Sequence, residues 1–405
     1  MINKGEVPEG YKKTKVGIIP EDWEVKRLGE IADVKGGKRI PKGYTLEDEN
    51  NGYPYITVSD MYMGGVSASA IKYVPLAVVD KISNYRISKN DIFISVAGTL
   101  GIVGIVPEEL DGANLTENAD KITNIKIEKD YLLYVCMSNI IQKEIKKEKT
   151  TNAQPKLALK RIRNFDISIP YQDEQQKIAQ ILSTWDEAIE LKEKLIEEKK
   201  EQKKGLMQKL LTGEVRLPGF DGEWEEVRLE DVAECLDNKR IPLNSAEREK
   251  MKGDIPYYGA NGIVDYINDY IFDEKLILLA EDGGNFDEFS TKPIAIRVKG
   301  KSWVNNHAHI LRPLNIDYDY LFYELVHKDI RKYINGTTRS KLTRGEMIKI
   351  LILAPKNIKE QKSIAQILTT ADKEIDLLTQ ELEQLKLQKK GLMQLLLTGI
   401  IRVKS

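Results

Sequence analysis

The side chains best suited to recognition chemistry lie in two short segments in the second half of this 405-residue chain. The segments, 255–262 and 303–309, combine aromatic rings with carboxamides. Carboxamides can form paired hydrogen bonds with adenine, which favours a binding surface. A Tyr-Tyr-Gly turn is also common in protein cores, so packing is the alternative interpretation. The candidate binding residues are Tyr257, Tyr258, Asn261, Asn305, Asn306 and His307.

Polar and cationic residues gather in two loops, 150–156 and 336–341, and in a Lys-Arg-Ile-Pro segment that occurs twice. Hydroxyl, amide and cationic groups together suit contact with the phosphates and base edges of DNA. The candidate DNA-contacting residues in these segments are Lys38, Arg39, Thr151, Asn152, Gln154, Lys156, Lys239, Arg240, Thr338, Arg339, Lys341 and Arg344.

A catalytic centre is not indicated. The chain has no Asn-Pro-Pro-aromatic motif for adenine methylation, no G-x-G-x-x-G fingerprint and no Walker sequence. A nuclease-like Glu-Val-Lys at 24–26 recurs as Glu-Glu-Val at 225–227, so the lysine is not repeated. His307 and His309 have the spacing of a ligand pair, but without a third ligand nearby we expect hydrogen-bonded structure rather than zinc. We expect no catalytic residue, no metal and no cofactor on this chain.

An internal repeat organises the whole chain. Residues 174–216 align with 360–402, and about 25 of the 43 positions are identical. A second shared block begins at Trp23 and at Trp224, and a third closes each region near 156–170 and 341–355. The predicted plan is a domain (1–170), a long helix (171–217), a domain (218–355) and a long helix (356–405). The middles of the two domains differ almost completely, as two different ligands on one symmetric frame would require.

Residues 174–211 and 360–397 are predicted to be long helices, because they contain no proline and their apolar residues follow helical spacing. Each helix would span about 57 Å. Lys192 and Lys199 in the first copy replace leucines of the second. We expect antiparallel pairing within the chain; packing of each helix on a partner subunit is the alternative. The seam of the second copy is Ala371, Ile375, Leu378, Leu382, Leu385, Leu392 and Leu396, with a polar gap at Lys389.

Each large region is predicted to be an α+β domain. Short β-branched or aromatic runs bounded by turn residues indicate strands at 53–58, 92–96, 276–280 and 294–298, among helical stretches. The predicted fold class is α+β, with two pseudo-repeated globular recognition domains joined by two long helices that form an antiparallel coiled coil.

Composition limits the partners and the compartment. The net charge of −1 argues against nucleic acid for the chain as a whole, so DNA contact would need local cationic clusters. Residues 218–355 are the most acidic region, where contact must come from a local cluster or from a partner's charge. The two cysteines support neither a zinc ribbon nor a disulfide framework, and no apolar run could span a bilayer. We expect a cytoplasmic protein that makes no contact with membranes.

Together these motifs resemble the specificity subunit of type I restriction-modification systems, across essentially the full length. The resemblance rests on the paired Gln-Lys-Lys-Gly-Leu-Met-Gln and Leu-Leu-Thr-Gly helix ends, the Ile-Ala-Gln-Ile-Leu helix starts, the Trp and Leu entries, and segment 303–309. It implies two target-recognition domains, each reading one half of a bipartite site in double-stranded DNA. It also implies helices that act as a ruler and dock two methyltransferase subunits.

By the same resemblance, S-adenosylmethionine, ATP and magnesium would be bound by methyltransferase and restriction subunits, which would carry out methylation and cleavage. The acidic second domain is the one departure. Two other classes remain open: a self-contained DNA methyltransferase or nuclease, for which the motifs above are missing, and a coiled-coil scaffold that binds only protein.

Overall fold

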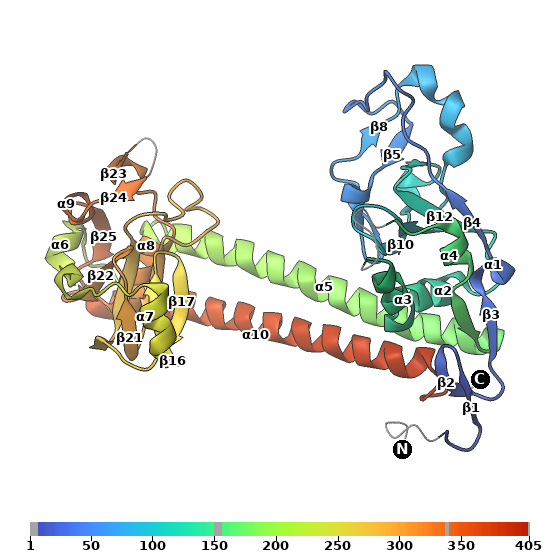
Figure 1. Ribbon diagram of the computed structural model, residues 1–405. Coiled ribbons are helices and arrows are strands. Elements are labelled where there is room, and N and C mark those ends of the chain that lie inside the picture. The colour runs from blue at the N-terminus through green and yellow to red at the C-terminus, as the bar shows by residue number, and fades with distance from the viewer. Residues whose placement is uncertain (1–6, 150–155, 337–339, 404–405) are drawn as a thin grey trace. The chain divides into compact units, whose positions relative to one another are not determined.

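The structure, a computed structural model, describes residues 7–149, 156–336 and 340–403. The chain divides into two compact units, 1–191 with 382–405, and 192–381. Each unit therefore contains one segment of each long helix (Figure 1). No helix in the described part of the chain is both long and apolar enough to cross a membrane.

The long helices are α5 (Gln172–Leu211) and α10 (Ile358–Leu397), of 40 residues each. Both begin two residues before the predicted start, and both end where predicted. The repeated Leu-Leu-Thr-Gly sequence explains the ends, because Gly213 and Gly399 adopt left-handed φ angles of 71° and 67° just beyond the last turn. Glycine adopts this conformation without a steric penalty, which is why it commonly ends helices.

The first unit is built on an antiparallel sheet with the strand order β10-β9-β12-β4. Strands 53–58 and 92–96 were predicted and are observed as β5 and β9. The elements of this unit are β1 (Tyr11–Thr14), β2 (Gly17–Pro20), β3 (Glu24–Arg27), α1 (Leu28–Ile31), β4 (Asp33–Gly36), β5 (Pro54–Ile56), β6 (Met61–Tyr62), β7 (Gly65–Val66), β8 (Lys72–Tyr73), β9 (Ile92–Ser95), β10 (Val103–Ile105), β11 (Asn114–Leu115), β12 (Ala119–Thr123), α2 (Lys129–Met137), α3 (Asn139–Lys149), α4 (Leu159–Arg163) and β13 (Asp166–Ile169).

The second unit is built on an antiparallel sheet with the order β20-β19-β22-β15. The predicted strands at 276–280 and 294–298 are β19 and β20. The elements of this unit are β14 (Trp224–Arg228), α6 (Leu229–Val232), β15 (Ala233–Cys235), α7 (Ser245–Lys250), β16 (Lys252–Gly259), β17 (Gly262–Ile267), β18 (Phe272–Asp273), β19 (Leu276–Ala280), β20 (Ala295–Val298), β21 (Lys301–Val304), β22 (Ala308–Pro313), α8 (Tyr318–Val326), β23 (Ile334–Asn335), β24 (Lys341–Leu342), α9 (Arg344–Met347) and β25 (Leu351–Pro355).

The two sheets have the same topology although their sequences differ. In both, the strand after the short entry helix forms one edge. The last strand of the sheet along the chain lies beside it, and the two strands between them in sequence come next, which gives β4-β12-β9-β10 and β15-β22-β19-β20. The entry strand of each unit also pairs antiparallel with its exit strand, β3 with β13 and β14 with β25. The flanking sheets are different: β11-β5-β8 in the first unit and β17-β16-β21-β18 in the second. The four-stranded sheet and the paired entry and exit strands are therefore a repeated frame, whereas the sheets attached to it differ between the units.

Ion pairs explain why lysines occupy two positions of the helix seam. In the second unit Lys192 pairs with Glu381 at 2.8 Å and Lys199 with Glu374 at 2.6 Å. Residue numbers rise along α5 as they fall along α10, so the two helix segments run antiparallel in this unit. Lys192 and Lys199 can therefore occupy positions where the other copy has leucine, because each charge meets a carboxylate.

The polar gap at Lys389 belongs to a repeated Tyr-Asp-Lys contact. In the first unit the Tyr134 hydroxyl donates to Asp186 at 2.7 Å, and Lys389 pairs with Asp186 and lies over the Tyr134 ring. In the second unit the corresponding residues are Tyr323, Asp372 and Lys203. The lysine at the polar gap therefore helps to attach the two long helices to α2 in the first unit, and Lys203 does the same at α8 in the second unit.

Candidate functional site

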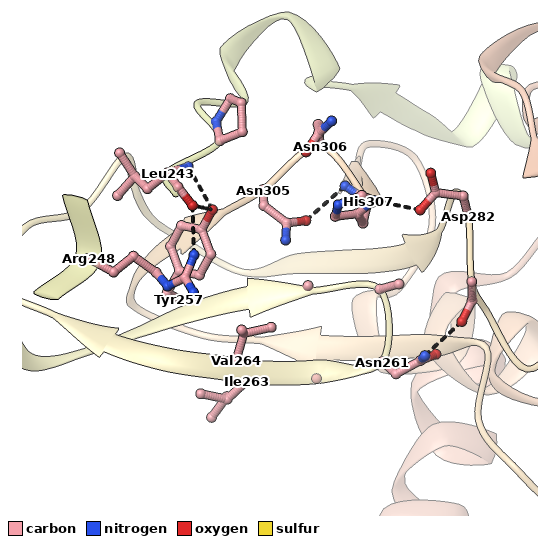
Figure 2. A pocket seen from close by; sticks show the side chains of 15 residues that line it. Leu243, Arg248, Tyr257, Asn261, Ile263, Val264, Asp282, Asn305, Asn306 and His307 are labelled. Atoms are coloured by element: carbon pink, nitrogen blue, oxygen red, sulfur yellow. Dashed lines mark hydrogen bonds and ion pairs between the residues drawn. The ribbon is translucent and has the colours of Figure 1, made fainter. Parts of the chain in front are cut away.

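Five of the predicted binding residues of the second unit meet at one hollow, which we call the amide hollow. It has a volume of about 550 Å³ and lies where β19 ends and β22 begins (Figure 2). Four segments of the chain line it: residues 242–248, the β16–β17 hairpin, the loop after β19, and the loop between β21 and β22. The predicted residues that line it are Tyr257, Asn261, Asn305, Asn306 and His307.

Intramolecular hydrogen bonds fix the polar groups of the amide hollow. Asn305 Oδ1 accepts from the backbone N–H of His307 at 2.8 Å, and Asn261 Nδ2 donates to the carbonyl of Gly283 at 2.8 Å. His307 Nδ1 lies 2.6 Å from Asp282 Oδ1. These contacts hold each side chain in one orientation before any ligand arrives, which reduces the entropy lost on binding.

The wall of the amide hollow is largely apolar. Tyr257 is 1% exposed, its hydroxyl accepts from the backbone N–H of Leu243 at 2.9 Å, and the Arg248 guanidinium lies 5.2 Å from its ring centre. Tyr257 therefore packs and positions, as the alternative interpretation of its segment proposed. Tyr258 lies on the same strand and is half-buried; burial raises the pKa of its hydroxyl.

A cluster of charged residues stabilises the loops that form the hollow. Arg240 pairs with Glu281 and donates to the carbonyl of Ala308 at 3.0 Å, and Lys341 pairs with Glu281 at 3.0 Å. Burial opposes ionisation of Glu281, but the hydrogen bonds from Arg240 and Lys341 outweigh it and hold the pKa of this carboxyl below its usual value. Arg240 thus positions the loop that carries His307, whereas Lys239 and Arg344 are exposed.

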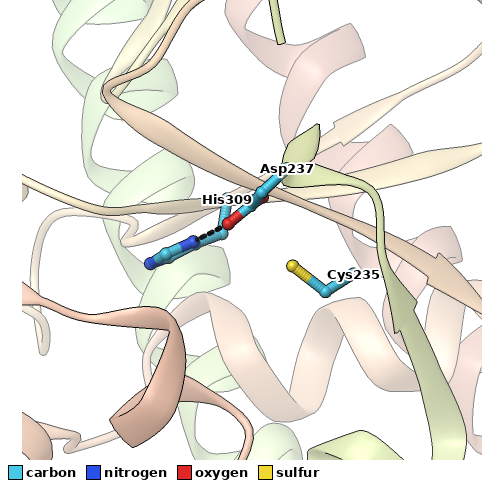
Figure 3. Close-up of side chains that lie close together, drawn as sticks. All are labelled: Cys235, Asp237 and His309. Atoms are coloured by element: carbon cyan, nitrogen blue, oxygen red, sulfur yellow. Dashed lines mark hydrogen bonds and ion pairs between the residues drawn. The ribbon is translucent and has the colours of Figure 1, made fainter. Parts of the chain in front are cut away.

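One group of three side chains among the described residues has metal-ligand chemistry: Cys235, Asp237 and His309 (Figure 3). Both ring nitrogens of His309 face acceptors, with Nδ1 2.6 Å from Asp237 and Nε2 2.8 Å from the Leu342 carbonyl oxygen. Burial raises the pKa of the Cys235 thiol to about 11, so the thiol is protonated at neutral pH. Through these bonds His309 on β22 links the turn after β15 to β24, and the absence of a metal on this chain stays a prediction.

In the first unit the structure describes three predicted residues. Lys38, Arg39 and Lys156 are all exposed. Arg39 Nε lies 2.5 Å from Glu117, and the Lys38 ammonium lies 5.6 Å from the ring centre of Tyr85. Lys38 follows β4 and Glu117 precedes β12, so these side chains occupy the same end of their sheet as the amide hollow does in the second unit.

Five predicted residues, Thr151, Asn152, Gln154, Thr338 and Arg339, lie outside the described residues. The roles of all the predicted residues stay predictions. Sequence reasoning missed Asp282, Glu281 and Arg248, because single charged residues on loops or on a short helix such as α7 carry no periodic signal. It also missed Tyr134 and Tyr323, which a repeated Asp-Tyr-Leu-x-Tyr segment at 130–134 and 319–323 could have indicated.

Comparisons with known proteins agree with this two-unit plan. The model of the type I restriction modification DNA specificity domain matches residues 20–200 and 221–387. A Methanocaldococcus jannaschii protein assigned as the type I restriction enzyme MjaX specificity subunit is 28% identical over 431 aligned residues, which cover 98% of each chain.

Two solved structures share the fold. The type I restriction-modification S subunit from M. genitalium has a TM-score of 0.59 at 19% identity, covering 92% of this chain and 96% of that one. A chain solved in work on complex assembly and conformational transition of the type I system has a TM-score of 0.58 at 17% identity, covering 94% and 99%.

Proposed function

The chain belongs to the type I restriction modification DNA specificity family, and we propose that it reads a bipartite site in double-stranded DNA, one half with each unit. The family match covers both units, and the role of this chain is DNA recognition as a specificity subunit. We propose further that the chain itself is not catalytic and that methylation and cleavage are carried out by other subunits. A cytoplasmic location stays a prediction.

The observation that carries this proposal is a repeated frame with different attachments. The order of the four-stranded sheet is the same in both units, whereas the flanking sheets and the loops differ. A protein that bound one repeated ligand would gain from two similar surfaces. Two different surfaces on equivalent frames instead suit two different DNA sequences, each read by its own unit.

The residues proposed to contact DNA are those at the loop end of each sheet. In the second unit the amide hollow supplies base-reading groups, and the exposed Lys239 and Arg344 supply charge for phosphates. In the first unit Lys38, Arg39 and Lys156 serve the phosphates, with Thr151, Asn152 and Gln154 as predicted neighbours. Local cations of this kind meet the objection that the overall charge is −1.

We propose that α5 and α10 form an antiparallel coiled coil that sets the spacing between the half-sites and docks two methyltransferase subunits. Ion pairs within the second unit, together with buried Ile196 and Leu382, support the pairing. Leu191, Leu377 and Leu387 lie off the seam with 59–67% of their surface exposed, so they offer apolar area to a partner.

Cofactors follow from this division of roles. S-adenosylmethionine would be bound by the methyltransferase subunits, and ATP and magnesium by restriction subunits that join through the complex. Such partners would supply the catalytic motifs that this sequence lacks.

The experiment is reconstitution with the cognate methyltransferase subunits, followed by mapping of methylated adenines in random-sequence DNA. We expect two fixed blocks separated by an unspecified spacer, and no methylation by the chain alone when S-adenosylmethionine, ATP and magnesium are supplied. A single uninterrupted site, or activity of the isolated chain, would contradict the proposal.

A further inference from the structure

The carboxamide of Asn305 presents its donor group to the amide hollow. The residue is 8% exposed, and its Oδ1 is occupied by the backbone N–H of His307 at 2.8 Å. Its Nδ2 is directed over Gly259, where a Cβ atom would stand 3.4 Å from it. A ligand that enters the hollow beside Gly259 therefore meets the N–H groups of Nδ2.

Asn261 has the opposite polarity. Its Nδ2 donates to the carbonyl of Gly283 at 2.8 Å, so Oδ1 remains as an acceptor. His307 Nδ1 lies 2.6 Å from the Asp282 carboxylate; when Nδ1 carries the single ring proton and donates it there, Nε2 is a second acceptor. The His307 side chain is 43% exposed, so this lone pair can be reached. The hollow thus combines a fixed donor with fixed acceptors.

An apolar edge completes the arrangement. Ile263 and Val264 lie on β17, line the hollow, and are 48% and 57% exposed (Figure 2). Two aliphatic side chains exposed beside fixed amides form a surface for a small apolar group. In DNA the group of that kind in the major groove is the 5-methyl of thymine.

We propose that the amide hollow reads the major-groove edge of one A·T pair in the half-site of the second unit. Asn305 Nδ2 donates to adenine N7, Asn261 Oδ1 or His307 Nε2 accepts from the adenine 6-amino group, and Ile263 and Val264 contact the thymine methyl. This assignment rests on the proposed function and adds the identity of one base pair.

The pattern of groups discriminates against a G·C pair. Adenine places an acceptor and a donor side by side on one base, and thymine adds a methyl group. Guanine places two acceptors, N7 and O6, side by side, so the acceptors of Asn261 and His307 would face O6 without a proton between them. An unpaired acceptor buried at an interface costs affinity, which is the physical basis of the selection.

The first test compares wild type with Asn305→Asp, each as the full chain with its cognate methyltransferase subunits. Asn305→Asp keeps the shape and the contact to the His307 N–H, but replaces the donor with an acceptor. Asn268→Asp is the matched control, because Asn268 is exposed in the same unit outside the hollow and makes the same change of charge. Preferred sites are selected from random DNA by methylation.

We expect Asn305→Asp to lose selection at one A·T pair of one block, with the other block unchanged and Asn268→Asp like wild type. If both blocks stay as in wild type, or selection is lost at a G·C pair, the inference is wrong and the proposed function stands. If wild type selects no fixed blocks, both fail.

The second test replaces the assigned adenine with 7-deazaadenine, which lacks N7. We expect wild-type binding to weaken about tenfold, and binding by Asn305→Asp to be unaffected by the replacement, since its partner for N7 is already lost. A penalty of equal size in both proteins would show that Asn305 does not contact N7.

Discussion

Arg402 and Glu174 are 228 positions apart in the chain and form a two-bond ion pair, with Nε 2.8 Å and Nη2 2.9 Å from the carboxylate oxygens. Arg216 and Glu360 repeat the contact in the second unit, at 2.8 and 3.0 Å. In each unit the end of one long helix is thereby joined to the beginning of the other, beside the entry tryptophan, Trp23 or Trp224. The sequence repeat is therefore a repeat of contacts.

Removal of these arginines should destabilise the two units to different extents. Arg402→Met leaves Glu174 with the indole N–H of Trp23 at 3.1 Å. Arg216→Met leaves Glu360, 0% exposed, without that help, because Trp224 Nε1 has no hydrogen-bond partner among the residues that the structure describes. We expect a loss of about 2 kcal/mol for Arg402→Met, reduced because Arg402 is partly exposed, and a larger loss for Arg216→Met.

Denaturant unfolding measures both losses, and hydrogen exchange assigns each to its unit. Arg228→Met is the control, because its partner Glu230 is at the surface, and it should cost less than about 0.5 kcal/mol. Equal effects for all three variants would mean that the paired contacts do not hold the helix ends.

Asp120 should make stability depend on pH. The residue is 5% exposed, and burial raises the pKa of its carboxyl to about 6 from the usual 3.8, only partly offset by Lys156 and Arg163. In the folded chain this group holds its proton up to about pH 6, so wild type loses stability as the pH rises from about 4 to 6. Asp120→Asn removes that loss.

The measurement is the free energy of unfolding of wild type and Asp120→Asn at several pH values. The difference should be near zero at pH 4, grow in favour of the variant up to about pH 6, and stay constant above that. Asp48→Asn, at an exposed side chain, should show no such growth. A constant difference at every pH would contradict the raised pKa.

The two long helices and four of the strands could be predicted because their signals are local. Periodic apolar residues predicted α5 and α10, and short apolar runs predicted β9 and β19. Contacts such as Arg402 with Glu174 could not be predicted, since either charge could serve many partners. The arrangement of donors and acceptors in the amide hollow could not be predicted either. It depends on which atom of the Asn305 side chain bonds to the backbone of His307.

The ruler proposal predicts a change of spacing without a change of sequence. Four residues inserted into both helices, between Ile189 and Leu206 and between Ile375 and Leu392, add about one turn, or roughly 6 Å, and keep the seam nearly in phase. The half-sites should then lie one or two base pairs further apart, at about 3.4 Å each. Methylation mapping reports the spacing; an unchanged spacer would mean that partner contacts set the distance.

The most direct test of the central claim is an exchange of residues 218–355 for the matching region of a relative with a different recognition site. Methylated adenines are then mapped with the same methyltransferase subunits. If each unit reads its own half, one block of the site is replaced by the relative's block, and the other block and the spacer remain. A change in both blocks, or in neither, would contradict independent reading by two units.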